Sequence, residues 1–110
     1  MEKEKIQYLP LGSVVIIKGA VRKVVIIARG LITVIEEEAK YFDYGGCIYP
    51  EGMVGDQILY FNHQDIHKVL HEGFHDEDDE MMVDNINEWY QKTEIERGNP
   101  YEINKKNQKV

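Results

Sequence analysis

The sequence predicts an α+β domain, in which a small antiparallel sheet of four to five strands is followed by one amphipathic helix packed on it. Two observations support this prediction. Between residues 12 and 74 the apolar residues occur in short runs rich in valine and isoleucine, separated by glycine and proline. From residue 77 onward, apolar residues instead recur at helical spacing.

Residues 13–17 and 24–28 are the first two apolar runs. Their β-branched side chains favour strands, and Gly19 between them predicts a β-hairpin with a loop of four to six residues. Because consecutive positions in both runs are apolar, we expect both faces to be covered and both strands to be central. Residues 31–35 form a third strand, or they continue the second strand past a bend at Gly30.

A solvated turn at glutamates 36–38 precedes the next strand, which we place at residues 41–49. Gly45 and Gly46 interrupt that strand, and such a pair indicates a bulge or a close backbone contact. A proline and a glycine then mark a turn at residues 50–52.

Residues 58–61 have the composition of a further strand, which ends at Asn62. Residues 68–74 are ambiguous, and Gly73 favours a strand or a loop over a helix.

The helix is predicted from about residue 77 to residue 97. Asp76 or Asp78 can cap its start, and the acidic run that follows suits the positive end of the helix dipole. Arg97, Gly98 and Pro100 provide a basic last turn, a terminal glycine and a helix breaker. The apolar stripe consists of Met82, Ile86, Trp89 and Thr93, and it is widened by Met81 and Tyr90.

The length of 110 residues predicts one domain, which we place at residues 9–97 between a polar lead-in at 1–8 and a polar tail at 98–110, of which we expect residues 104–110 to be frayed. The N-terminus shows no secretory signal, and the longest apolar run, residues 24–28, is too short to span a membrane. With a single cysteine, Cys47, the chain cannot form an internal disulfide. We therefore expect a soluble cytoplasmic protein without membrane insertion.

The net charge of −7 is unevenly distributed along the chain. Residues 1–35 carry +4 (six basic, two acidic), residues 36–96 carry −14 (three basic, seventeen acidic), and residues 97–110 carry +3 (four basic, one acidic). The acidic middle would repel nucleic acids and anionic membranes, which argues against both as main partners. A basic or dipolar protein partner is compatible with this charge.

Four histidines occur at a spacing of four residues, at positions 63, 67, 71 and 75. On one continuous helix they would share a face and could hold zinc or nickel. Gly73 interrupts that register and the His-Glu-x-x-His pattern is missing, so we expect surface histidines and no metal.

Other catalytic or cofactor chemistry finds little support in the sequence. Cys47 would need a nearby histidine to act as a nucleophile, and a small buried residue is its commoner role. Gly45 and Gly46 lack the lysine of a phosphate-binding loop, and the acidic residues 76–80 lack the spacing of a calcium loop. We expect no cofactor and no enzyme, with a small metal- or cysteine-dependent enzyme as the alternative from another class.

Aromatic residues of the glycine-rich segment 43–52 and the helical stripe are the candidates for contact with a protein partner. Packing of the stripe on the sheet, and of most of the aromatics in the core, is the role that we expect first, and it is compatible with a partner contact at the edge of the stripe. The contact residues predicted are Tyr44, Tyr49, Met81, Trp89 and Tyr90.

Several segments together resemble a small uncharacterised family, a domain of unknown function of low-GC Gram-positive bacteria. Genes of that family commonly lie in type VII secretion loci, beside LXG-type polymorphic toxins. The segments are Leu-Pro-Leu-Gly-Ser-Val-Val at 9–15, Asp-Tyr-Gly-Gly-Cys-Ile-Tyr-Pro-Glu-Gly at 43–52, Phe-Asn-His-Gln-Asp-Ile at 61–66 and Glu-Gly-Phe at 72–74.

This resemblance implies a cytoplasmic accessory role near toxin export, as a chaperone or adaptor for a toxin or another component of the locus. It brings no catalytic residue with it. An immunity protein that neutralises a cognate toxin is the alternative within the class of binding proteins.

Overall fold

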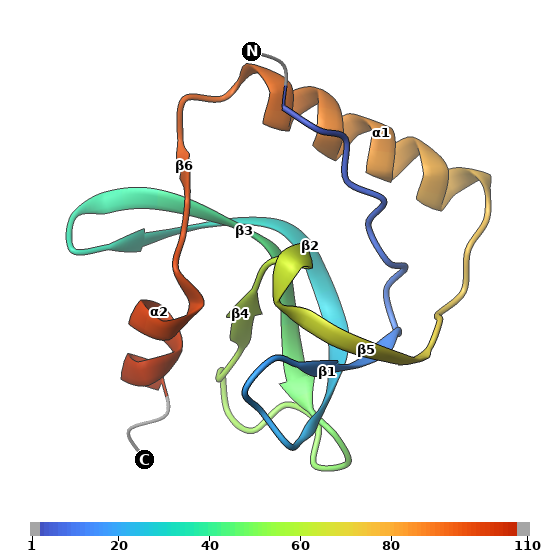
Figure 1. Cartoon of the computed structure of the whole chain (residues 1–110), viewed down its shortest axis with the longest axis vertical. Coiled ribbons are helices and arrows are strands. Elements are labelled where there is room, and N and C mark those ends of the chain that lie inside the picture. The colour runs from blue at the N-terminus through green and yellow to red at the C-terminus, as the bar shows by residue number, and fades with distance from the viewer. Residues whose placement is uncertain (1–2, 108–110) are drawn as a thin grey trace.

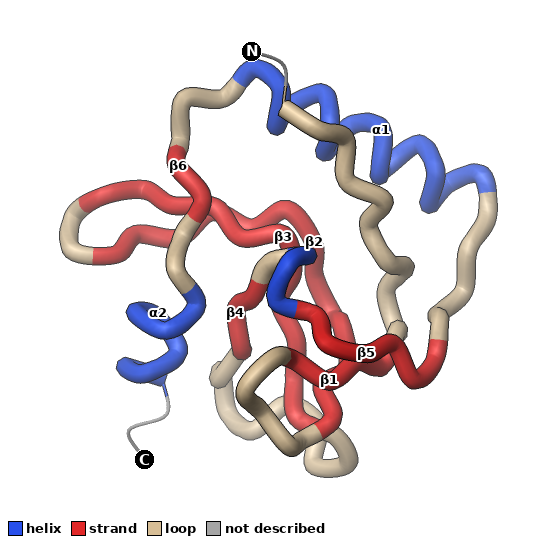
Figure 2. Tube along the Cα trace, in the orientation of Figure 1, coloured by secondary structure: helices blue, strands red, loops and turns tan. Residues whose placement is uncertain are grey.

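The computed structural model describes residues 3–107, and an antiparallel sheet forms the centre of the protein (Figures 1 and 2). Its main path follows the order β4–β3–β2–β1–β5. The strands are β1 (Val14–Ile17), β2 (Lys23–Ile35), β3 (Glu38–Ile48), β4 (Leu59–Phe61) and β5 (Ile66–His71). The chain continues with α1 (Glu77–Lys92), the two-residue strand β6 (Glu96–Arg97) and α2 (Pro100–Asn107). The predicted α+β fold is confirmed.

β1 and β2 form the predicted hairpin, and the loop between them spans residues 18–22. Both strands are internal, since β1 lies between β2 and β5, and β2 lies between β1 and β3. β2 passes through Gly30, whose φ of +62° bends the strand without ending it. Of the two interpretations of residues 31–35, the continuation of the second strand is therefore correct.

Gly45 and Gly46 lie where β3 passes closest to β2. The β2–β3 register shifts between Ile26 and Ala28, so β2 carries an extra residue opposite the glycine pair. A Cβ on either glycine would lie only 2.5 Å from a side-chain carbon of β2. The predicted bulge and the predicted close contact are both present.

The turn between β2 and β3 consists of two glutamates. Ile35 pairs with Glu38, which leaves Glu36 and Glu37 as the loop, with φ values of +49° and +70°. Two positive φ values are typical of a type I′ turn, where asparagine and glycine are the usual residues. The solvated turn is confirmed, but it has a strained backbone that the residue types do not suggest.

The buried apolar residues form two clusters within residues 3–107. The larger one joins the sheet to α1 and the N-terminal arm, and its members are Tyr8, Val15, Val24, Ile26, Tyr44, Phe61, Val83 and Ile86. The smaller one joins the distal part of the β2–β3 hairpin to α2, and it consists of Ile35, Phe42 and Ile103, with Tyr60 of β4 packed against it.

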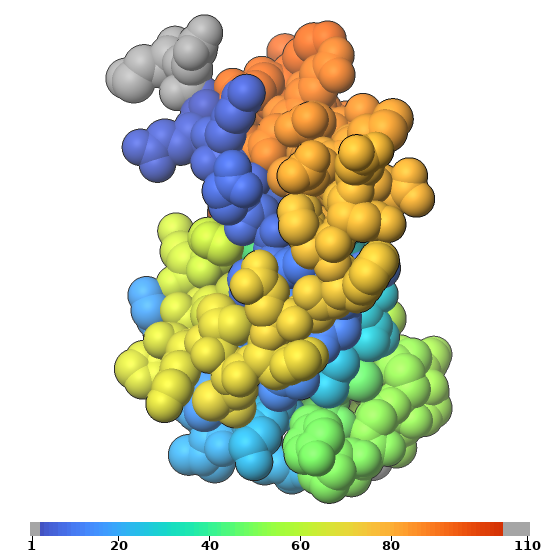
Figure 3. All heavy atoms as spheres, turned by 90° about the vertical axis from the view of Figure 1, so that its right-hand side faces the viewer, coloured from blue at the N-terminus to red at the C-terminus, as the bar shows by residue number. Residues whose placement is uncertain are grey.

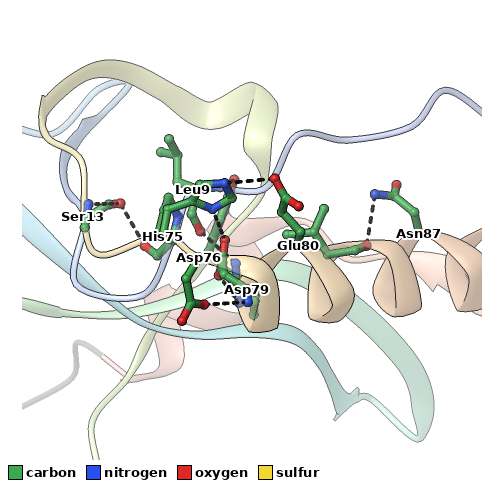
Figure 4. A network of polar contacts seen from close by, with 12 residues as sticks. Leu9, Ser13, His75, Asp76, Asp79, Glu80 and Asn87 are labelled. Atoms are coloured by element: carbon green, nitrogen blue, oxygen red, sulfur yellow. Dashed lines mark hydrogen bonds and ion pairs between the residues drawn. The ribbon is translucent and has the colours of Figure 1, made fainter.

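α1 begins where the sequence predicts. Asp76 is the N-cap, and one of its carboxylate oxygens accepts a hydrogen bond of 3.1 Å from the backbone N–H of Asp79. Asp79 forms a nearly buried ion pair of 2.7 Å with Arg29 of β2, and His75 lies 2.8 Å from its other oxygen. Arg29 also donates to the carbonyl of Leu9. This network (Figure 4) fixes the start of α1 and the N-terminal arm to the sheet.

The predicted end of α1 at residue 97 is wrong, because the helix stops at Lys92. The hydroxyl of Thr93 accepts a hydrogen bond from the N–H of Ile95, which supports an extended chain at this point. Residues 96–97 then pair with β3 as the short parallel strand β6. Pro100 occupies the first position of α2, where a proline is well tolerated.

The buried face of α1 is rotated from the predicted stripe. Val83, Ile86 and Asn87 are the buried residues of the helix, whereas Met82 is half exposed. The reason is that Asn87 faces the N-terminal arm and satisfies its backbone there. A polar side chain, that of Asn87, is therefore buried, whereas the helical pattern predicts mainly apolar residues on the buried face.

Both segments flanking the predicted domain pack against it. The N-terminal arm runs beside α1 (Figure 3). The side-chain amide of Asn87 forms hydrogen bonds with both the N–H and the C=O of Ile6, and the side-chain amide of Gln91 does the same with the N–H and the C=O of Lys3. The predicted polar tail at 98–110 contains α2, and Asn104, where the predicted fraying begins, makes the same two-sided pairing with Tyr60 of β4. Residues 108–110 lie outside the described part of the chain.

Candidate protein-binding surface

Tyr44, the first predicted contact residue, is fully buried. Its ring stacks on Phe61 at 5.3 Å and meets the edge of Tyr8 at 5.7 Å. Its hydroxyl accepts from the N–H of Leu9 at 3.0 Å and lies 2.7 Å from Nδ1 of His63. Burial raises the pKa of this hydroxyl. The prediction that Tyr44 contacts a partner is wrong, because the side chain belongs to the core.

Trp89 and Tyr90 lie together at the end of α1, over the sheet. The ring of Tyr41 on β3 meets the edges of both, at centroid distances of 5.5 Å and 5.4 Å. The guanidinium of Arg97 lies 5.0 Å from the Tyr41 ring and 5.1 Å from the Tyr90 ring. Lys3 approaches the Tyr90 ring at 4.8 Å. The ring of Tyr90 thus makes most of its contacts within the protein, while Trp89 stays partly exposed.

The outer part of the β2–β3 hairpin continues this aromatic cluster as an exposed apolar face. Ile32 pairs with Tyr41 and Val34 pairs with Ala39, so these four side chains share one face of the hairpin. Ile32 is 51% exposed and Val34 is 67% exposed. Because Tyr41 contacts Trp89, the hairpin face and the end of α1 are adjacent.

Two methionines extend the apolar surface along α1. Met82 precedes Trp89 by seven residues and shares its side of the helix. Met81, which is 65% exposed, lies about 100° further around the helix axis, toward its outer side. Exposed methionines adapt their shape to a partner. We call the set Ile32, Val34, Met81, Met82 and Trp89 the α1–hairpin surface.

Acidic side chains border this surface. α1 has six acidic residues and one lysine, which gives the helix a charge of −5. Asp79 is paired with Arg29 below the helix, but residues such as Asp78, Asp84 and Glu88 are exposed. A partner that covers the methionines would therefore meet a negative rim, which favours basic partner side chains.

Tyr49, the remaining predicted contact residue, lies apart from this surface. It follows the last residue of β3, eight residues beyond Tyr41 and about 26 Å from it along an extended strand. The segment 49–58 forms the end of the molecule opposite α1 (Figures 1 and 3). Tyr49 is half exposed, and the Nζ atom of Lys23 lies 5.7 Å from the centroid of its ring. The five predicted residues are therefore one core residue, three residues on α1 and one residue at a second location.

A buried polar network occupies the centre of the molecule. Asp43 of β3 is fully buried, and it accepts hydrogen bonds from the Tyr8 hydroxyl at 3.1 Å and the His63 N–H at 2.8 Å. It also pairs directly with Arg97 of β6. Burial, with a contribution from Asp43, raises the pKa of Tyr8. All the groups in the network satisfy one another, so its role is to join the arm, β3 and β6.

The histidines are distributed over different elements. His63 lies in a short 3-10 turn and is half buried, His67 and His71 lie on β5, and His75 pairs with Asp79. Burial lowers the pKa of His63, whereas the hydrogen bond to Asp79 raises that of His75. In residues 3–107 no three histidine, cysteine or acidic side chains are grouped closely enough to hold a metal ion.

Cys47 lies at the wall of a small apolar cavity. The thiol side of β3 faces away from the larger core cluster, because a Cβ on the adjacent Gly46 would point into that core, against Val24 and Phe61. Among the described residues, those that line the cavity include no histidine. The arrangement that would activate this cysteine as a nucleophile is therefore not built here.

Sequence reasoning missed Ile32 and Val34. Ile32 and Val34 alternate with Leu31, Thr33 and Ile35, so the two groups lie on opposite faces of the strand. Because both groups are mainly apolar, the sequence does not indicate which face is buried. The Tyr41 and Arg97 cluster was also missed, since its members are far apart in sequence.

The comparisons with known proteins give one family. A family model described as "Domain of unknown function (DUF4176)" matches residues 8–82. No curated protein and no solved structure gives a match. Of the helices in the described part of the chain, none combines the length and the apolar character needed to cross a membrane.

Proposed function

The chain belongs to the DUF4176 family over residues 8–82, and from this membership and its exposed apolar surface we propose a non-enzymatic accessory role in type VII secretion. In this proposal the protein is a cytoplasmic chaperone or adaptor of a Gram-positive bacterium. It binds an LXG toxin or another protein component of the same locus, and it needs no cofactor.

The α1–hairpin surface is the observation that carries the proposal. Three of its five residues are exposed by half or more, namely Ile32, Val34 and Met81, and Trp89 adds a partly exposed aromatic ring. Large apolar side chains grouped on a surface and bordered by charges are typical of protein interfaces. Half-buried tryptophan and methionine are common anchors of such interfaces.

The acidic rim of α1 favours a partner with basic residues beside its apolar ones. The same charge would slow association with nucleic acids and anionic membranes. A protein partner is therefore the class that fits both the apolar and the charged part of the surface.

Co-expression with the toxin encoded beside the gene tests this proposal. We expect the protein to co-purify with the toxin at a fixed stoichiometry through size-exclusion chromatography. Two truncated toxins, the N-terminal LXG region and the C-terminal toxic domain, then separate the roles. A chaperone or adaptor binds the LXG region, whereas an immunity protein binds the toxic domain. Failure to recover a complex with any protein of the locus would contradict the proposal.

A further inference from the structure

We propose that the cavity beside Cys47 is a second binding site, which receives one aliphatic side chain of the protein partner. This inference rests on the proposed function, because it assumes that a protein partner exists. It concerns the end of the molecule opposite α1 and adds an anchor point there (Figure 3).

The cavity is formed by the glycine-rich segment 43–52 and by the residues that follow it up to Leu59. One wall is the end of β3, with Gly46, Cys47 and Ile48, and the other is the loop that returns to β4. Apart from Glu51 and Gln57, the residues that line it are apolar or glycine. An apolar group would therefore gain more than a polar one by entering.

The size of the cavity selects the occupant. Its volume is about 80 Å³. Sites for drug-sized molecules and cofactors have about 300–1,000 Å³, so a free ligand of that class does not fit. An engineered apolar cavity of about 150 Å³ accommodates benzene, and the present one holds roughly half as much. A branched aliphatic side chain is of this size.

The surroundings indicate that the group arrives on a polypeptide. Three large apolar residues are exposed on the same loop, at 49%, 47% and 59%: Tyr49 and Met53, which directly follow the cavity residues Ile48 and Gly52, and Val54, which lines the cavity itself. A small free ligand would leave them in water, whereas a polypeptide would cover them together with the pocket. An anchor in a pocket within a ring of covered contacts is the usual arrangement of an interface hot spot.

The loop around the cavity is held in place by its own contacts. The N–H of Gly52 donates to the carbonyl of Ile48 at 2.7 Å, and Gly52 has a φ of +80° that favours glycine. Arg22 from the β1–β2 loop pairs with Glu51. The N–H of Gln57 donates to the carbonyl of Val54 at 3.2 Å. A pocket formed by such a restrained loop loses little conformational entropy on binding.

Two measurements on the whole protein test the inference. The first uses xenon as an apolar probe and follows backbone amide shifts by NMR. We expect saturable shifts at the residues that line the cavity, and their loss in Cys47→Met, whose longer side chain fills it. Thermal unfolding of the variant confirms that it folds. If xenon leaves these amides unchanged, the site does not accept an apolar group and the inference is overturned.

The second measurement compares partner binding between two matched variants. Val54→Asp places a carboxylate at the wall of the cavity, and Val21→Asp places one at a 93% exposed valine of the β1–β2 loop. We expect Val54→Asp and Cys47→Met to bind the toxin encoded beside the gene about tenfold more weakly or worse, and Val21→Asp to bind as the wild type does.

The outcomes separate this inference from the proposed function. If the wild type binds the toxin and the cavity variants bind equally well, the cavity is not part of the interface and this inference alone is overturned. If the wild-type protein binds no protein of the locus, the proposed function is contradicted and the cavity loses its proposed occupant as well, whatever the xenon result.

Discussion

Gly98 illustrates how single residues are constrained by distant parts of this chain. It follows β6 and lies against the ring of Phe42, and its N–H donates to the carbonyl of Tyr41 at 2.8 Å. A Cβ at this position would lie 2.3 Å from the nearest carbon of the Phe42 ring. The requirement for glycine is therefore steric and comes from packing against β3.

We predict that Gly98→Ala lowers the free energy of unfolding by about 1–3 kcal/mol, because the added methyl overpacks the core at Phe42. Gly55→Ala is the comparison, since its φ of +61° adds strain but a Cβ there meets nothing within 4 Å. Urea unfolding of both variants measures the difference. A Gly98→Ala protein as stable as the wild type would refute this packing argument.

Asp43 is the residue on which the buried network depends. Replacing it with asparagine keeps the shape but leaves the Arg97 guanidinium without its anionic partner. Removing one member of a buried ion pair typically costs about 3–5 kcal/mol. Because Arg97 is 24% exposed, we predict the lower end, about 3 kcal/mol, by urea unfolding of Asp43→Asn.

The exposed pair between Lys40 and Glu96 provides the control for Asp43→Asn. It links the same two strands, β3 and β6, at 2.9 Å. Lys40→Met should cost clearly less stability than Asp43→Asn, because solvent screens the pair. Equal losses in the two variants would show that burial of Asp43 is not what makes its pairing important.

His63 predicts a dependence of stability on pH. Burial lowers its pKa below the ordinary value of 6.5, so the folded protein binds fewer protons there than the unfolded chain. This contribution to stability is fully present above pH 6.5 and is lost as the pH falls through the lowered pKa. The hydroxyl of Tyr44 accepts from the Leu9 N–H and lies 2.7 Å from Nδ1 of His63, a nitrogen that can accept from it only when the imidazole is neutral.

Thermal unfolding between pH 7.5 and 5 in the His75→Ala background measures this contribution, because the raised pKa of His75 gives a dependence of opposite sign. We expect the midpoint to fall on acidification, and the fall to be smaller in a His63→Gln variant of the same background. Identical slopes with and without His63 would contradict the assignment.

At the scale of elements, the β2–β3 hairpin combines an unfavourable turn with an exposed apolar face. Glu36 and Glu37 adopt left-handed backbone conformations, and Ile32 and Val34 stand exposed nearby. Strained backbone and exposed apolar residues both lower stability, and they are commonly retained where a surface binds a partner.

We predict that Glu36→Asn with Glu37→Gly raises the free energy of unfolding by about 1–2 kcal/mol, because these residues suit the type I′ turn. Thermal unfolding of the double variant measures the gain. A double variant less stable than the wild type would mean that the glutamate side chains contribute contacts that outweigh the strain.

Local sequence signals predicted those elements that local chemistry determines. The β1–β2 hairpin and the start of α1 at Asp76 follow from residue types within a few positions. The end of α1 could not be predicted in this way, since β3 recruits residues 96–97 and Phe42 fixes Gly98. α2 was missed for the same reason, because the pairing of Asn104 with β4 joins segments 44 residues apart.

The candidate surface was predictable in part. Met81 is exposed and Trp89 is partly exposed, and the helical pattern placed them on one element. Tyr44 was misassigned because an aromatic residue in a glycine-rich strand gives no sign of which face is buried. The hairpin face was missed because its exposure depends on where α1 and α2 pack, which no local pattern contains.

At the scale of the whole molecule, the two candidate contact regions lie at opposite ends of the sheet, and apart from Ile32 and Val34 their residues belong to the acidic middle of the chain. Some basic side chains of the two terminal segments pair with groups inside the protein. Lys3 donates to the carbonyls of Tyr90 and Thr93 at the end of α1, where the helix dipole favours a cation. The exposed charge that a partner meets on α1 is therefore negative.

Titration calorimetry with the toxin encoded beside the gene measures whether a protein partner binds the α1–hairpin surface. Val34→Asp should weaken the affinity about tenfold or more, because it places a charge in the apolar face, while Val21→Asp, at a still more exposed valine outside that surface, should leave it unchanged. Equal affinities of the wild type and Val34→Asp would contradict binding at this surface.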